Sequence, residues 1–145
     1  MIAVDTNVLV HAHRQDSPFH APALASLRGL VEGSARWAVP WPCVHEFLAV
    51  TSHPRIWRPP TPLAVALAAC RAWTASPLLL FIGEGPGHLD SLESVTEGAA
   101  VAGPRVHDAR IAAICLQHGV KELWTADRDF SRFPALRCRN PLVTP

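Results

Sequence analysis

The chain has 145 residues, of which 49% are hydrophobic and 17% are charged, enough for one compact domain and too few for two. Its 12 acidic and 13 basic residues give a formal net charge of +1, which argues against a strongly basic, histone-like binder of nucleic acid. The high apolar content also excludes a disordered chain.

Short apolar runs alternate with helical patterns along the whole chain. In chain order we expect strand 2–4, a short helix around 8–10, a helix between Ser17 and Gly33, strand 37–39, helix 42–53, helix 63–73, strand 78–82, helix 89–100, helix 106–118, strand 122–126 and an edge strand at 136–139. This alternation predicts a three-layer α/β/α domain with a central, mostly parallel sheet.

Local signals mark the ends of several of these elements. Ser17–Pro18 and Thr61–Pro62 each place a capping residue before a proline in a first helical turn. Residues 78–82 are apolar on both faces, as in a central parallel strand. The glycine-rich residues 83–87 lack the Gly-Lys-Ser/Thr ending of a phosphate-binding loop and predict a simple turn.

Targeting and spanning segments are not predicted. The apolar residues 1–4 are followed at once by Asp5, with no basic stretch before them. The longest apolar run, Leu63–Cys70, has eight residues, against the roughly 20 that a spanning helix needs. The four cysteines are widely spaced and predict reduced, mostly buried thiols. We expect a soluble, cytoplasmic protein that makes no contact with a membrane.

Several acids directly follow predicted strands, whose carboxyl ends gather functional groups in parallel sheets. Asp5 follows the first strand, and Asp127 and Asp129 follow a late one. Asp5 can cap the next helix, although Thr6 and Asn7 can do the same. An ordinary Asp turn is the alternative interpretation of the later pair.

Two further acids lie on predicted helices. Asp108 lies in the apolar stripe near the start of helix 106–118, where an unpaired carboxylate is costly; capping of that helix is the alternative. Glu46 lies at the border of the apolar arc of its helix, where a solvated acid is the ordinary interpretation. Together, three or four carboxylates without thiolate ligands favour Mg²⁺ or Mn²⁺, ions that activate water and stabilise displacement at a phosphodiester.

The sequences around these acids resemble the four acidic motifs of PIN-domain ribonucleases. They are IAVDTNVLV at 2–10, VHEFL at 44–48, VHDARIAA at 106–113 and LWTADRDF at 123–130. Their order and spacing match the family from Met1 to about Phe133. The compact length is most similar to that of the VapC-type toxins of bacterial toxin–antitoxin pairs, which implies a single PIN domain over residues 1–145.

The resemblance implies a Mg²⁺-dependent endoribonuclease that acts on structured RNA such as transfer or ribosomal RNA, with Mn²⁺ as the alternative ion. By position it implies that Asp5 and Asp108 are the metal ligands, and that Glu46 and Asp127 complete the catalytic acidic pocket. It further implies a cognate VapB-type antitoxin that covers the site, and a homodimer or a toxin–antitoxin hetero-oligomer.

Other side chains of these motifs are implied as supports of the site. Thr6, Asn7 and Thr125 would hold the ligating carboxylates in fixed orientations. Asp129 would replace or supplement Asp127, or only cap a turn. We favour Asp127 as the acid of the pocket, because it directly follows Thr125–Ala126 at the end of the predicted strand.

Some basic and aromatic residues are candidate RNA contacts. Arg55, Trp57 and Arg58 interleave charge and aromatic surface just beyond the Glu46 helix, a pattern that binds phosphate and stacks bases. A packed loop with solvated arginines explains the same residues. Arg14 and Arg110 lie close in sequence to the acids, and either bind phosphate or pair with carboxylates.

Other functions compete with the toxin ribonuclease. A housekeeping PIN nuclease without an antitoxin would share the same motifs. A phospho-receiver-like interaction module would need an Asp after a mid-chain strand, and the sequence has none between Asp16 and Asp90. A dehalogenase-like phosphatase would need a second Asp where this chain has Asn7.

Overall fold

A computed structural model describes residues 1–143. Its centre is a sheet of five parallel strands in the order β3-β2-β1-β4-β5. The strands are β1 (Ile2–Val4), β2 (Trp37–Pro40), β3 (Leu79–Ile82), β4 (Glu122–Trp124) and β5 (Cys138–Arg139). The helices are α1 (Thr6–His13), α2 (His20–Val31), α3 (Trp41–Thr51), α4 (Leu63–Trp73), α5 (His88–Thr96), α6 (Arg105–Gln117) and the 3₁₀ helix η1 (Arg128–Arg132).

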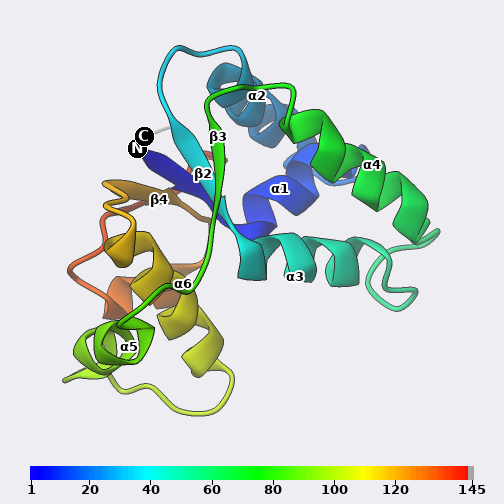
Figure 1. Ribbon diagram of the computed structural model, residues 1–145. Helices are drawn as coiled ribbons and strands as arrows, with labels where there is room; N and C mark the ends of the chain where they lie inside the picture. Colours follow the sequence, from blue (N-terminus) through cyan, green and yellow to red (C-terminus); the bar gives the residue numbers. More distant parts are fainter. Residues whose placement is uncertain (144–145) are drawn as a thin grey trace.

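The helices cover the sheet from two sides. Helices α1 to α4 gather on one side of the strands, and α5 and α6 lie on the other (Figure 1). This arrangement confirms the predicted α/β/α fold. The described helices, within residues 1–143, include none long and apolar enough to cross a membrane.

The strand order reverses beside β1. From β1 the chain moves outward through β2 to β3, and then returns to the other side of β1 to add β4 and β5. Strands β1 and β4 pair in register, with Ile2 beside Glu122 and Val4 beside Trp124. Open parallel sheets bind their ligands outside the carboxyl ends of the strands at such a reversal. In the flavodoxin-like order of phospho-receiver domains the second strand forms an edge, whereas here β2 lies between β3 and β1.

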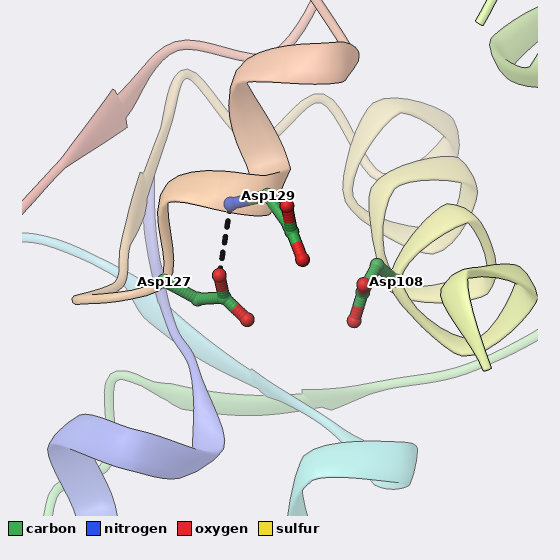
Figure 2. Close-up of side chains that lie close together, drawn as sticks. All are labelled: Asp108, Asp127 and Asp129. Carbon is green, nitrogen blue, oxygen red and sulfur yellow. Dashed lines mark hydrogen bonds between the residues drawn. The ribbon is translucent and has the colours of Figure 1, made fainter. Parts of the chain in front are cut away.

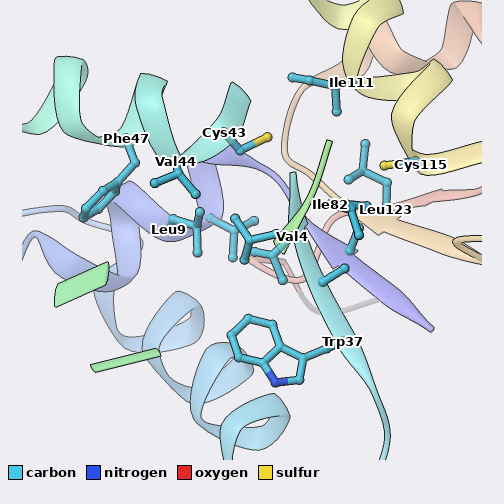
Figure 3. Close-up of a cluster of buried hydrophobic side chains, with 14 of the residues drawn as sticks. Val4, Leu9, Trp37, Cys43, Val44, Phe47, Ile82, Ile111, Cys115 and Leu123 are labelled. Atoms are coloured by element: carbon cyan, nitrogen blue, oxygen red, sulfur yellow. The ribbon is translucent and has the colours of Figure 1, made fainter. Parts of the chain in front are cut away.

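The core fills the space between the sheet and the helices (Figure 3). Trp37 of β2 is fully buried, and its indole N–H donates a hydrogen bond of 3.2 Å to the Ser76 hydroxyl. Phe47 of α3 is also fully buried and packs edge-on against Trp73, with ring centroids 5.0 Å apart. The four cysteines are free, and three of them are buried, which confirms the prediction of reduced thiols.

The expectation that residues 78–82 form a central strand is wrong, because β3 lies at the edge of the sheet. Leu80 is 39% exposed, whereas Ile82 is buried and the ring of Phe81 stacks on Trp41 with centroids 4.8 Å apart. The apolar pattern of this segment therefore reflects packing of its faces against neighbouring side chains. It carries no information about whether both edges of the strand are paired.

The predicted capping roles of Ser17 and Thr61 are also wrong. Helix α2 begins only at His20, and the Ser17 hydroxyl accepts from the backbone N–H of Phe19, in the turn before the helix. Helix α4 begins after Pro62 without a side-chain cap, and the Thr61 hydroxyl instead accepts from Arg14 at 3.1 Å. The Thr61 hydroxyl binds a side chain far away in the sequence, and the Ser17 hydroxyl binds the backbone of a turn that precedes the helix. A local capping pattern reveals neither contact.

The positions of β4 and β3 predict different costs for the same truncation. Leu123 of β4 is fully buried, so Leu123→Ala should lower the free energy of unfolding by about 2–5 kcal/mol. Leu80→Ala, at the half-exposed edge strand, should cost no more than about 0.5–1 kcal/mol. Urea denaturation of both variants measures the difference, and equal losses would contradict the burial of Leu123 and the exposure of Leu80.

Candidate metal centre

Asp5 lies at the junction of β1 and α1, and its carboxylate is only 4% exposed. One oxygen, Oδ1, accepts from the Thr6 backbone N–H at 2.7 Å and faces the Cys43 thiol at 3.6 Å. The other, Oδ2, accepts from the Thr125 hydroxyl and the Asn7 amide, each at 2.6 Å. Asp5 is therefore both the cap of α1 and the centre of a buried network that joins the ends of β1 and β4.

The three residues predicted to support the acids extend this network. The Thr6 hydroxyl donates to Glu46 Oε2 at 2.5 Å and so joins α1 to α3. The Asn7 amide oxygen accepts from the backbone just after β4 at 2.9 Å. The Thr125 hydroxyl accepts from the Asp127 backbone N–H at 3.0 Å. Each of them fixes an acid, or the chain segment that carries one.

A cluster of carboxylates lies at the start of α6 and η1. Oxygens of Asp108, Asp127 and Asp129 all lie within 4.8 Å of one another, and the three side chains point toward a common space (Figure 2). Asp127 caps η1, because its Oδ1 accepts from the Asp129 backbone N–H at 2.8 Å. Asp108 is not a cap, because α6 begins after Pro104. The structure thus brings Asp129 into the cluster beside Asp127.

The predicted acids share one cleft. A cleft of about 330 Å³ is lined by all four of Asp5, Glu46, Asp108 and Asp127. A second cleft, of about 430 Å³, is lined by Glu46 and Asp108 again, together with Asp129. The acids therefore lie where two hollows of the surface meet.

Burial raises the pKa of Asp5 to about 6, against its ordinary value of 3.8. The hydrogen bonds from Thr125 and from the Thr6 backbone oppose this shift, and the charge of Glu46 adds to it. The donors to Asp5 are all neutral, so no cation among the described residues cancels the charge of its ionised form.

Burial also raises the pKa of Asp108, and the charges of Asp127, Asp129 and Glu46 raise it further. The described residues offer Asp108 no hydrogen bond or ion pair. Oxygen ligands of this kind are those that Mg²⁺ and Mn²⁺ prefer. The residues present therefore fit a divalent cation, which would relieve the repulsion among them.

Two of the arginines predicted as RNA contacts are engaged within the protein. The Arg14 side chain is 10% exposed and pairs with both oxygens of Asp16, at 2.8 and 2.7 Å. It also donates to Thr61 and lies over the Trp57 ring, 4.7 Å from its centroid. Arg110 pairs with Glu84. Arg14 thus holds the Trp57 segment against α1 and has little freedom to bind phosphate.

Of the other three candidate RNA contacts, one lines a cleft and two do not. Trp57 lines the cleft of the four acids, whereas Arg55 and Arg58 are exposed and line neither cleft. Three basic side chains of the clefts escaped the sequence analysis: His11, Arg105 and His107. Helical spacing could have placed two of them beside the site. His11 follows Asn7 by four residues and Arg105 precedes Asp108 by three, so each pair lies on one face of its helix.

The repulsion at Asp108 predicts how Asp108→Asn behaves without metal. In EDTA at pH 7 the variant should melt a few degrees above wild type, because the raised pKa means that ionised Asp108 destabilises the folded state. The difference should fade as the pH falls toward 3.8, where both states take up the proton. Added Mn²⁺ should stabilise wild type more than the variant. A variant that melts below wild type at pH 7 would contradict the repulsion.

Comparison with known proteins agrees with the geometry of the site. The sequence profile of the PIN domain matches residues 2–136. The chain is 35% identical to ribonuclease VapC31 of Mycobacterium tuberculosis over 141 residues, which cover 97% of this chain and 99% of the relative. It is 34% identical to ribonuclease VapC25 of the same organism over 143 residues, or 99% of this chain and 100% of the relative.

Solved structures share the fold at lower sequence identity. VapC20 of Mycobacterium tuberculosis, a sarcin–ricin loop cleaving toxin, superposes with a TM-score of 0.66 at 19% identity, over 90% of this chain and 93% of that one. VapBC2 of Rickettsia felis, bound to a fragment of its promoter DNA, gives a TM-score of 0.67 at 16% identity, over 97% and 98%. The chain therefore belongs to the PIN-domain family, among the VapC ribonucleases.

Proposed function

We propose that this protein is the toxin of a type II toxin–antitoxin pair, an endoribonuclease that hydrolyses phosphodiester bonds in structured RNA with Mg²⁺ or Mn²⁺. The observation that carries the proposal is the convergence of Asp108, Asp127 and Asp129 beside buried Asp5, at the strand-order reversal of the sheet. The kinship with VapC ribonucleases supports the reaction. VapC20, which shares the fold, is a sarcin–ricin loop cleaving toxin, which is consistent with structured RNA as the substrate; transfer RNA and ribosomal RNA are the classes proposed.

Asp108, Asp127 and Asp129 would hold the ion, as the set of oxygens that lie within reach of one another. Of the two ligands predicted from the sequence, Asp108 belongs to this set and Asp5 lies deeper. The four acceptor positions of the Asp5 carboxylate face four donors. The 3.6 Å contact with Cys43 is the weakest, so Oδ1 is the oxygen that can exchange a partner for a cation.

When bound, the ion would stabilise charge on the phosphate and lower the pKa of a bound water. Glu46 is the group placed to take a proton. Its Oε2 is fixed by the Thr6 hydroxyl, while no described residue donates to Oε1. Oε1 is therefore free to accept a proton from the attacking water, and Asp5 would keep the segments of β1 and β4 in place during the reaction.

We propose a VapB-type antitoxin as the protein partner, in a hetero-oligomer or around a homodimer of the toxin. Solved VapBC and FitAB complexes have the same fold in their toxin subunits, which supports this partner. A housekeeping PIN nuclease is the alternative. The cytoplasmic location expected from the sequence stays a prediction.

Removal of a single carboxylate tests the reaction. Asp108→Asn should lower Mg²⁺-dependent cleavage of RNA by at least about 100-fold, because even residues that only orient metal ligands are worth about 10- to 100-fold. Asp90→Asn is the matched control, since Asp90 lies in the first turn of α5 as Asp108 does in α6. Purified proteins and an RNA pool suffice for the assay. Full cleavage by Asp108→Asn would refute the proposed site.

A growth assay distinguishes the toxin from a housekeeping nuclease. Expression of the wild-type chain alone should arrest its host, because a toxin without its antitoxin cleaves essential RNA. Expression of Asp108→Asn to the same level should leave growth unchanged. Colony counts and culture density after induction measure the effect, and normal growth with the active wild-type enzyme would favour the housekeeping alternative.

A further inference from the structure

The two clefts that meet at the acids differ in chemical character. Both contain Glu46, Asp108 and Ile111. Beyond these, one cleft is lined by the basic side chains Arg105, His107 and Arg110. The other contains the remaining residues of the acidic site, Asp5, Thr6, Asn7 and Asp127. Its other lining side chains are His11 and the apolar or aromatic Val10, Val50, Ile56, Trp57 and Phe130. A nucleotide chain that presents a phosphate to the acids would thus meet a basic surface on one side and an apolar slot on the other.

We propose that the cleft lined by His11, Ile56 and Trp57 is a nucleobase subsite, which binds the base next to the scissile phosphate and selects it through a hydrogen bond from His11. This subsite rests on the proposed ribonuclease function. It would explain why the enzyme prefers some RNA sequences over others. The cleft, of about 330 Å³, lies at the lower end of the range of about 300–1,000 Å³ for ligand pockets. RNA-binding proteins read single-stranded bases in this way, by stacking and by contacts to base edges.

The His11 ring is held in one orientation by Ser17. Its Nδ1 lies 2.7 Å from the Ser17 hydroxyl oxygen, and it packs in a T-shaped arrangement with the Phe19 ring, with centroids 5.2 Å apart. Ser17 is 6% exposed, and its oxygen already accepts from the Phe19 backbone N–H at 3.1 Å. The buried Ser17 hydroxyl proton finds its acceptor in His11 Nδ1. The neutral ring then carries its own proton on Nε2.

This arrangement leaves Nε2 as the donor of a ring that lines the cleft. The described part of the chain provides no acceptor for it. Burial lowers the pKa of His11, so the ring is an uncharged donor that favours a specific acceptor over phosphate in general. A base that lacks an acceptor at this point would leave the donor unpaired, and sites built in this way discriminate strongly between ligands.

The Trp57 ring of the same cleft also has a defined position. The guanidinium of Arg14 lies over this ring at 4.7 Å and is itself fixed by both oxygens of Asp16. The Trp57 indole N–H is buried, so Trp57 contributes the surface of its ring to the cleft and not a donor. Ile56 is 54% exposed and contributes apolar surface. Aromatic and apolar surface is therefore available to a base beside His11.

The experiment compares cut-site preference across variants of the full chain. A pool of short RNAs with randomised sequence is cleaved with Mg²⁺, and the new ends are sequenced. His11→Ala should flatten the preference at one position beside the cut and lower kcat/KM for the preferred sequence by about 10-fold or more, as expected for a lost donor in an apolar site. His11→Gln, which keeps an N–H donor, should retain part of the preference. Ile56→Ala should weaken it at the same position.

Two arginine variants test whether loss of positive charge has a different effect from loss of the proposed base contact. Arg105→Gln, in the basic cleft, should lower the affinity for all sequences and reduce the salt dependence of binding without changing the preference. Arg36→Gln removes the same charge from an exposed residue before β2, at the opposite end of the strands, and should change neither.

Different results of this experiment would refute the subsite alone or the ribonuclease function as a whole. If wild type cleaves and both His11→Ala and Ile56→Ala keep its sequence preference, the subsite is refuted and the ribonuclease function stands. If wild type cleaves no RNA with Mg²⁺ or Mn²⁺, the ribonuclease function fails and the subsite fails with it. Ile56 is exposed, so its variant decides the question even if His11→Ala does not fold.

Discussion

At the ends of β1 and β4 the buried carboxylate of Asp5 accepts hydrogen bonds from Thr125 and Asn7, and the rest of the site depends on this network. A buried charge is tolerated only when its hydrogen bonds are satisfied. Here neutral groups satisfy them, so the network joins two neighbouring strands without cancelling the negative charge. The same Thr125 hydroxyl fixes the backbone of Asp127, and Thr6 fixes Glu46. One buried group thus sets the positions of acids that come from three separate parts of the chain.

The near-neutral net charge of the chain conceals an uneven distribution. Asp5, Glu46, Asp108 and Asp127 meet in one cleft without a cationic partner among the described residues. Asp129 beside them pairs with Arg132 at 3.6 Å, and Arg14 and Arg110 pair with Asp16 and Glu84 elsewhere. The balance of charge therefore says little about how the protein binds RNA. In the proposed mechanism the acids would hold a divalent ion, which would supply positive charge for the phosphate, and the two clefts would bind the neighbouring nucleotides.

The sequence predicted the fold class and the acids because both depend on local patterns. Alternating strands and helices imply a parallel sheet, and its carboxyl ends collect residues such as Asp5 and Asp127. The edge position of β3 was not predictable, because hydrophobic pattern reports burial of faces and not strand order. The place of Asp129 depends on the turn of η1, which brings its carboxylate to the same side as that of Asp127. His11 was missed because its role depends on Ser17 and on a cleft that only the folded chain forms.

The position of the ion is the central claim and can be measured directly. Crystals grown with Mn²⁺ and measured at a wavelength with strong manganese anomalous scattering would locate it without any assay of activity. The account predicts an anomalous peak bounded by the carboxylates of Asp108, Asp127 and Asp129, on the side that faces Asp5. A peak at another place on the protein, or none at saturating Mn²⁺, would contradict it.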